Sequence, residues 1–360
     1  MGYGKYVLFR IVNLIIVLGI VTLMTAAIFD SAMTQILEAQ INEMVQNDLI
    51  QYIESMKASG KTPTQEELRE YEKSRIELYR KRYGLDKPFW IRILYRVRDV
   101  MTFNLGEATS PQISFAGSRE VKTIILGYLP NTVFLFTTGT LITILIGLLI
   151  GLQIAKRVGS FVDRLVSILA MVSNSLPMWW TGLLLIFLFA FQLRIFPAGG
   201  LHTIPPPEDK LLYIIDFLWH LTLPLLTIVL VSFGGWAYII RNLVIGTLQQ
   251  DFVMAARAKG IPERKVLYGH VLRAVSPSIV TMSILSLVNS LWGAMITEGI
   301  FNWPGIGRLY WVALETNDMA IIIGLTYVFT LLWLVALIII DLLYGLLDPR
   351  VKVGIGTTSS

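Results

Sequence analysis

The sequence predicts an all-α polytopic membrane protein with six transmembrane helices and an extended external helical segment. Hydrophobic residues make up 54% of the 360-residue chain, charged residues make up only 15%, and the mean hydropathy is +0.64. Several apolar runs reach about 20 residues, the length that a helix needs to cross a bilayer. A soluble core of this size would not hold so much apolar surface.

The first apolar run, residues 11–29, follows Lys5 and Arg10. It is too long for the core of a signal peptide and long enough to span, so residues 1–29 are expected to form a cytoplasmic N-terminus and an uncleaved first transmembrane helix. Residues 126–345 are expected to form the remaining transmembrane core, with residues 346–360 as a tail. Its five spans are predicted at 127–155, 165–192, 221–241, 276–298 and 320–345.

Charge in the short loops predicts the orientation. Lys and Arg gather on the side that carries both termini and the loop 242–275, so this side is expected to be cytoplasmic. The same bias explains the net charge of +5 without a nucleic-acid partner. The absence of cysteine excludes disulfides and thiolate sites, and the three histidines lie in separate segments, so no metal site is predicted.

Residues 30–125 form the predicted external segment. A first helix is indicated by apolar residues at helical spacing between Leu37 and Met56. A second is expected to begin with Thr62 as its cap, with Pro63 first and Gln65 closing a capping box, and to stop at Gly84. Two roles are open for this pair: a cover for the mouth of the protein, or a structural brace.

The cytoplasmic stretch "DFVMAARAKGIPERK" predicts two short helices joined by a sharp corner. Asp251 suits a helix start, Lys259 suits a helix end, and Gly260 can adopt the left-handed cap. Pro262 is expected at the first position of the second helix.

Small residues make this corner a candidate docking knob for another protein. The alternative is a basic loop that lies on lipid headgroups. The candidate contact residues are Asp251, Ala255, Ala256, Arg257, Lys259 and Gly260.

The chain resembles the dipeptide/oligopeptide permease family of ATP-binding-cassette importers, specifically the first of its two membrane subunits. The small-residue corner is similar to that family's "EAA" loop, although Met254 stands at the glutamate position. The segment from about 33 to 80 is longer than the family pattern. The motifs that carry the resemblance are "GLDKP" (84–88), "NLG" (104–106), "LPNT" (129–132), "SLPMWW" (175–180), "ARAKG" (256–260), "EGIFNWPGIGR" (298–308) and "DLLYGLLDPR" (341–350).

The resemblance implies a type I importer permease fold in the plasma membrane of a bacterium or archaeon. It implies a second permease subunit, two ATPase subunits that bind ATP and Mg²⁺, and an extracytoplasmic binding protein that delivers peptides. Oligosaccharides and nickel chelates are alternative substrates of the same architecture. The chain has no phosphate-binding loop of its own, so it is expected to bind no cofactor and to be a transport subunit rather than an enzyme.

Five residues are candidates for the pathway or its gate. Asn174, Ser175 and Pro177 interrupt the third span and could line a path or make a packing kink. Asn289 could bind substrate or join helices. Glu298 could bond a glycine-rich turn, or serve as a gate or a contact for the binding protein.

Two other classes of protein are disfavoured. A secondary transporter would need intramembrane ion ligands or an inverted repeat, and neither is evident. An intramembrane hydrolase would need an H-E-x-x-H motif, paired aspartates or a Ser/His pair in the spans.

Overall fold

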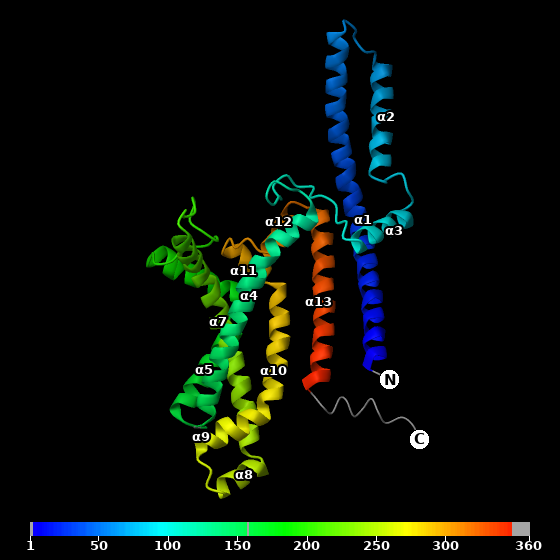
Figure 1. Ribbon diagram of the computed structural model, residues 1–360. Helices are drawn as coiled ribbons and strands as arrows, with labels where there is room; N and C mark the ends of the chain where they lie inside the picture. Colours follow the sequence, from blue (N-terminus) through cyan, green and yellow to red (C-terminus); the bar gives the residue numbers. More distant parts are fainter. Residues whose placement is uncertain (1–2, 157, 348–360) are drawn as a thin grey trace, which may run out of the picture. The chain divides into compact units, whose positions relative to one another are not determined.

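The computed structural model describes residues 3–156 and 158–347, which fold mainly into helices (Figure 1). Five helices are long and apolar enough to cross a membrane, and six spans result if one sharply bent pair counts as a single span. The all-α fold and, on that count, the six spans are therefore confirmed. The predicted tail falls largely on residues 348–360, which lie outside the described residues.

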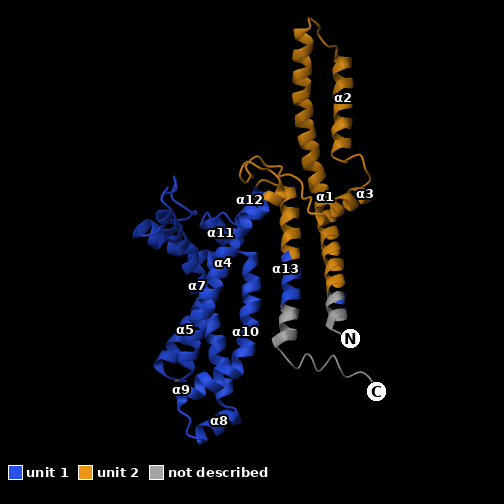
Figure 2. Cartoon of the chain, in the orientation of Figure 1, with its two compact units in different colours: residues 1–10, 124–315, 332–360 blue, residues 11–123, 316–331 orange. Residues whose placement is uncertain are grey.

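The chain separates into two compact units (Figure 2). One comprises residues 11–123 and 316–331, and the other comprises residues 1–10, 124–315 and 332–360. The first of these units, called the external unit here, contains the predicted external segment together with the apolar run before it. The predicted boundaries at residues 30 and 125 stay predictions.

The external unit begins with α1 (Tyr3–Ala58), a single helix that contains both the first apolar run and the first external stripe. The expected separation into a span and a distinct helix is wrong. No Gly or Pro occurs between residues 20 and 59, so nothing ends the helix before Gly60, which has φ +75°. Two shorter helices follow, α2 (Gln65–Arg82) and α3 (Phe89–Met101), and α3 lies crosswise to α1 (Figure 1).

The capping box of α2 lies two residues later than predicted. Thr64, not Thr62, is the N-cap: its hydroxyl accepts from the Glu67 N–H at 3.3 Å, and its own N–H donates to Glu67 Oε2 at 2.8 Å. This register places two glutamates in the first turn, where the helix dipole favours negative charge. The predicted stop is close to the observed one, with Tyr83 as C-cap and Gly84 at φ +69°.

The apolar stripes of α1 and α2 pack on each other. Leu37, Ile41 and Val45 are buried against a group that includes Ile76 and Tyr79. The pair is also joined by polar contacts, in which the Tyr79 hydroxyl donates to Asp48 at 2.8 Å and Arg75 pairs with Asp48 at 3.2 Å. The expected helical pair is therefore confirmed, whereas its role is untested.

The other unit carries the remaining helices apart from the start of α13 (Met319–Leu347), since residues 316–331 belong to the external unit. After α4 (Val121–Ala155), the third span is broken: α5 (Phe161–Ser175) and the helix that starts at Met178 differ in direction by 101°. The elements that follow are α6 (Met178–Leu185), η1 (Ile186–Gln192), α7 (Lys210–Leu248), α8 (Asp251–Ala258), α9 (Glu263–Lys265), η2 (Val266–Val271), α10 (Leu272–Asn289), η3 (Ser290–Trp292), α11 (Met295–Ile300), α12 (Ile306–Glu315) and α13 (Met319–Leu347).

The fifth span differs from the prediction at both ends. Its candidate helix runs from Glu263 to Trp292, not from 276 to 298. Gly293 ends it with φ +63° and ψ −164°, a conformation that side chains disfavour. Glu298 therefore lies in the separate helix α11, beyond the span.

Candidate functional site

The predicted corner is present after α8. This helix begins at Asp251, Lys259 is its C-cap, and Gly260 has φ +74°. The Gly260 N–H donates to the Arg257 carbonyl at 2.9 Å, and the Ile261 N–H donates to the Ala256 carbonyl at 3.3 Å. These bonds satisfy carbonyls that the end of the helix leaves open, as the left-handed glycine predicts.

The second half of the predicted hairpin is not a separate short helix. Pro262 is the N-cap rather than the first helical residue, and α9 continues through η2 into α10. Helical residues follow one another from Glu263 to Trp292, so the corner joins a short helix to the first residues of a candidate span. A force on α8 would thus act at the base of a long helix.

The two faces of α8 differ sharply. Val253 and Ala256 are buried, at 0% and 6% exposure, in a cluster built from α4, α7, η2 and α10. Phe252, Met254 and Ala255 are exposed. Ala256 thus packs into the core of its own unit rather than onto the exposed face of α8, and its predicted part in docking stays a prediction.

Charged residues brace the corner. Arg257 Nε donates to Glu263 Oε1 at 2.8 Å, and its Nη2 donates to Glu263 Oε2 at 3.3 Å. The guanidinium thus links α8 to the first turn of α9. Lys259, Gly260 and Asp251 are exposed. The Arg257 side chain is itself 42% exposed. Further exposed residues are Asp251, Phe252, Met254, Ala255, Lys259 and Gly260, together called the α8 outer face below.

Glu298 is fully buried, at 0% exposure. Its Oε1 accepts from the Thr132 hydroxyl at 2.9 Å, and its Oε2 accepts from the N–H groups of Gly307 at 2.8 Å and Arg308 at 3.1 Å. Desolvation raises the pKa of Glu298 to about 7 in spite of these donors. The contacts support the structural interpretation of Glu298.

Two sequence motifs meet at Glu298. The Asn131 amide donates to the Pro304 carbonyl at 2.8 Å, and Trp303 Nε1 donates to the Asn131 carbonyl at 3.0 Å. A Cβ at Gly305 would clash with both the Glu298 carboxylate and Thr132. The "LPNT" and "EGIFNWPGIGR" segments therefore form one bonded unit, called the Glu298 cluster below.

The other pathway candidates lie elsewhere. Asn174, Ser175 and Pro177 are exposed at the 101° break, and Asn289 is exposed at the end of α10. The side-chain oxygen Oδ1 of Asn174 would lie 3.1 Å from a Cβ at Gly235, so this side chain lies against α7. Neither asparagine hydrogen-bonds to Glu298 within the described part of the chain, so the five candidates do not make one site.

A polar cluster around Asp216 was not predicted. Its carboxylate accepts from the Thr203 N–H at 2.8 Å and from the Thr203 hydroxyl at 2.6 Å, and it lies 3.2 Å from His202 Nδ1 and 3.5 Å from His220 Nδ1. The i,i+4 spacing of Asp216 and His220 was a signal for this contact. Within residues 3–156 and 158–347, no group of three or more His, Cys, Asp or Glu is arranged to hold a metal ion.

A helical membrane chain with one broken span and a short helix held against the end of another span has the architecture of a transport permease. The profile of the family described as "Binding-protein-dependent transport system inner membrane component" matches residues 143–353, more than half of the chain. The chain belongs to this family, within its dipeptide and oligopeptide permease branch. It is a multi-pass membrane protein and the permease subunit of a peptide importer.

Relatives in three bacteria resemble it over most of their length. The oligopeptide transport system permease protein AppB of Bacillus subtilis is 29% identical over 276 residues, which cover 77% of this chain and 84% of that protein. The di/tripeptide transport system permease protein DppB of Pseudomonas aeruginosa is 32% identical, covering 75% and 83%. The dipeptide permease protein DppB of Alkalihalophilus pseudofirmus is 30% identical, covering 75% and 84%.

Proposed function

We propose that the chain forms half of the translocation pathway of an ATP-driven importer for dipeptides and oligopeptides, with the α8 outer face as its ATPase-docking surface. The other half comes from a second permease subunit of the same type. An extracytoplasmic binding protein delivers the peptide, and two ATPase subunits bind ATP and Mg²⁺. The chain itself binds no cofactor.

The two-faced geometry of α8 carries this proposal. The inner face is anchored by Val253 and Ala256, whereas Phe252 and Met254 expose apolar surface at 42% and 53%. Exposed large apolar residues beside a charged rim are typical of a protein contact. The contact would be transmitted through the Arg257–Glu263 pair and the corner at Gly260 into α10.

The substrate class is supported by the relatives, whose names specify oligopeptides, dipeptides and tripeptides. The orientation is supported by the Lys/Arg bias of the short loops, which places α8 and both termini in the cytoplasm. The corresponding location is the plasma membrane of a bacterium or archaeon.

The broken third span is the proposed pathway element. A break of 101° frees backbone groups that would be costly in lipid, so this region needs protein or water around it. The exposed Asn174 and Ser175 at the break supply polar groups suited to peptide amides. Asn289 is a second exposed amide, on α10.

The docking role is tested by Ala255→Glu, which places a carboxylate on the α8 outer face without entering the core. The variant is expected to reach the membrane and to fold, but to lose most of its association with the ATPase subunits, because an unpaired charge at a packed contact is costly. The measurements are copurification of the ATPases with the tagged chain and peptide uptake in vesicles.

Ala58→Glu is the matched control, since Ala58 is also exposed and lies at the end of α1 in the external unit. It is expected to keep both copurification and uptake. Normal copurification and uptake with Ala255→Glu would contradict the docking assignment. Uptake of nickel chelates or oligosaccharides, but not peptides, by the unaltered complex would contradict the substrate assignment.

A further inference from the structure

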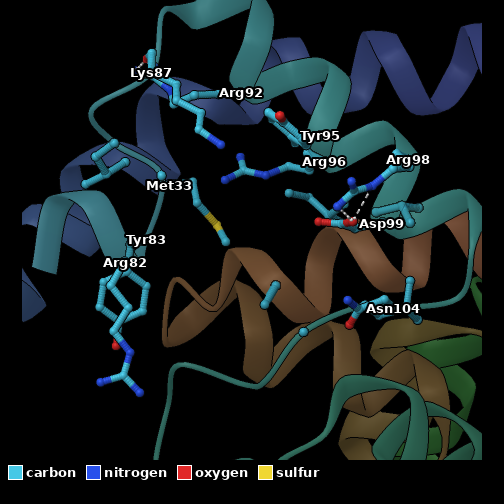
Figure 3. Close-up of a pocket in the computed structure, with 17 residues that line it drawn as sticks. Met33, Arg82, Tyr83, Lys87, Arg92, Tyr95, Arg96, Arg98, Asp99 and Asn104 are labelled. Atoms are coloured by element: carbon cyan, nitrogen blue, oxygen red, sulfur yellow. Dashed lines mark hydrogen bonds and ion pairs between the residues drawn. The ribbon is translucent and has the colours of Figure 1, made fainter.

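A cavity of about 420 Å³ lies in the external unit, lined by residues from α1, the end of α2, α3, the start of α13 and two connecting segments (Figure 3). Two of the sequence motifs line it: Gly84, Leu85 and Lys87 from "GLDKP", and Asn104, Leu105 and Gly106 from "NLG". The proposed transport function assigns these motifs no role. The cavity is therefore a candidate site of its own.

The cavity is strongly cationic. Asp99 is the one carboxylate in its lining, and it pairs with Arg98 at 2.7 Å. Asp30, on the adjacent turn of α1, pairs with Arg92 and lies 3.7 Å from Arg96. Even when both carboxylates are counted, three positive charges remain in excess. The five cations of the lining are Arg82, Lys87, Arg92, Arg96 and Arg98.

Arg96 is the cation with unsatisfied bonding capacity. Its Nη1 is buried and makes no hydrogen bond among the described residues; the nearest carboxylate oxygen, Asp30 Oδ1, lies 3.7 Å away, beyond hydrogen-bond distance. Figure 3 shows its guanidinium reaching into the middle of the cavity beside Met33, whereas Arg82 points away. Burial lowers the pKa of Arg96, which reflects the cost of keeping this charge out of water. An anion in the cavity would offset that cost.

Tyr95 holds two further cations at the rim. Lys87 Nζ lies 4.0 Å from the centre of the Tyr95 ring, and the Arg98 guanidinium lies 5.0 Å from it. The Lys87 carbonyl also accepts from Arg92 Nη1 at 3.2 Å. The cations are thus positioned before any ligand arrives, which favours a compact anion over a loose counterion cloud.

The cavity lies beside the ends of two apolar helical stretches. Ala320 and Ile323 belong to the first turns of the candidate span Met319–Ile339, and Met33 follows closely on the apolar run of α1. Headgroup phosphates lie at such boundaries. On its outer face, α3 exposes Trp90 and Leu94 at 70% and 61%, and a basic helix with exposed aromatic and apolar residues is typical of the membrane interface.

We propose that this cavity binds the phosphate group of an anionic phospholipid, with Arg96 as the main ligand and with Trp90 and Leu94 among the acyl chains. The bound lipid would fix α3, and with it the base of the α1–α2 pair, to the membrane surface. A free phosphate would meet the same cations, but the exposed apolar side chains Trp90 and Leu94 of α3 favour a lipid.

The test is lipid retention by the full chain, purified in detergent and examined by native mass spectrometry after titration with phosphatidylglycerol. Arg96→Gln and Lys87→Gln are each expected to weaken retention about tenfold, the loss of one charge-assisted hydrogen bond. Arg69→Gln is the matched control, because Arg69 is exposed on α2 and does not line the cavity. It is expected to retain lipid as the unaltered chain does.

Parallel titrations with phosphatidylcholine and with inorganic phosphate distinguish the sources. Selective retention of phosphatidylglycerol that depends on Arg96 and Lys87 supports the proposal. Equal retention of phosphatidylcholine, or Arg96-dependent binding of inorganic phosphate without lipid binding, overturns it. If Arg96→Gln unfolds, the test rests on Lys87→Gln. Retention of phosphatidylglycerol by Lys87→Gln equal to that of the unaltered chain then overturns the proposal. If both variants retain lipid normally but the binding protein no longer stimulates ATP hydrolysis by the assembled transporter, the cavity would instead bind an acidic protein.

Discussion

Removing the Glu298 carboxylate should destabilise the fold around α11 and α12. In Glu298→Ala, the Thr132 hydroxyl and the N–H groups of Gly307 and Arg308 all lose their acceptor in a fully buried site. Each buried donor left without a partner costs about 1–3 kcal/mol, so the three together predict a loss of at least about 3 kcal/mol. Glu298→Gln keeps an oxygen for the two backbone donors and should lose roughly 1 kcal/mol.

Thermal unfolding of the full chain in detergent, followed by tryptophan fluorescence, measures this difference. Trp303 is buried within the Glu298 cluster and is one of the nine tryptophans that give the signal. Glu298→Ala is expected to lower the apparent Tm by more than about 5 °C. Glu70→Ala, an exposed glutamate of α2, is the matched control with little expected change. An Ala variant that melts with the unaltered chain would refute the role assigned to these bonds.

Three further predictions follow from the same geometry. Burial raises the pKa of Glu298 from 4.5 to about 7, so between these pH values the folded chain holds a proton that the unfolded chain releases. The free energy of unfolding should therefore fall by about 3 kcal/mol as the pH rises from below 4.5 to above 7. Melting curves of Glu298→Gln recorded at several pH values should lack this dependence. Ala256→Glu places a carboxylate in the core cluster and should reduce the yield of folded chain, whereas Ala255→Glu should not; equal yields in size-exclusion profiles would contradict the assigned faces. In intact cells, an impermeant thiol reagent should label Glu70→Cys and spare Pro262→Cys, and labelling of both would overturn the orientation.

Local signals predicted the corner between α8 and α9 well. The left-handed conformation of Gly260 and the helix start at Asp251 follow from short-range rules, and both are observed. The direction of Ala256 could not be read in this way, because it depends on α9 continuing into α10 and folding η2 against α8. The register of the α2 cap was ambiguous for a different reason. Thr62 and Thr64 are each followed three residues later by Gln or Glu, so both fit the capping-box spacing, and that spacing alone does not choose between them.

The long-range contacts of the candidate site could not be predicted from the sequence. Glu298 and Thr132 are separated by 166 residues, and nothing in either motif alone indicates that they bond. The continuity of α1, by contrast, was available from the missing helix breakers between its two stripes. The contact between Asp216 and His220 was likewise available from helical spacing, whereas the approach of His202 depends on how the preceding loop folds.

Cross-linking from position 254 tests the coupling role of α8 most directly. The chain contains no cysteine, so Met254→Cys introduces one reactive thiol on the α8 outer face, where Met254 is 53% exposed. In the assembled transporter, a thiol-to-amine cross-linker is expected to join this position to an ATPase subunit, with a yield that changes when ATP is added. Ser74→Cys, on the exposed surface of α2, should give no such product. An ATPase adduct from position 74, or none from position 254 in a complex that still transports, would contradict the proposed docking surface.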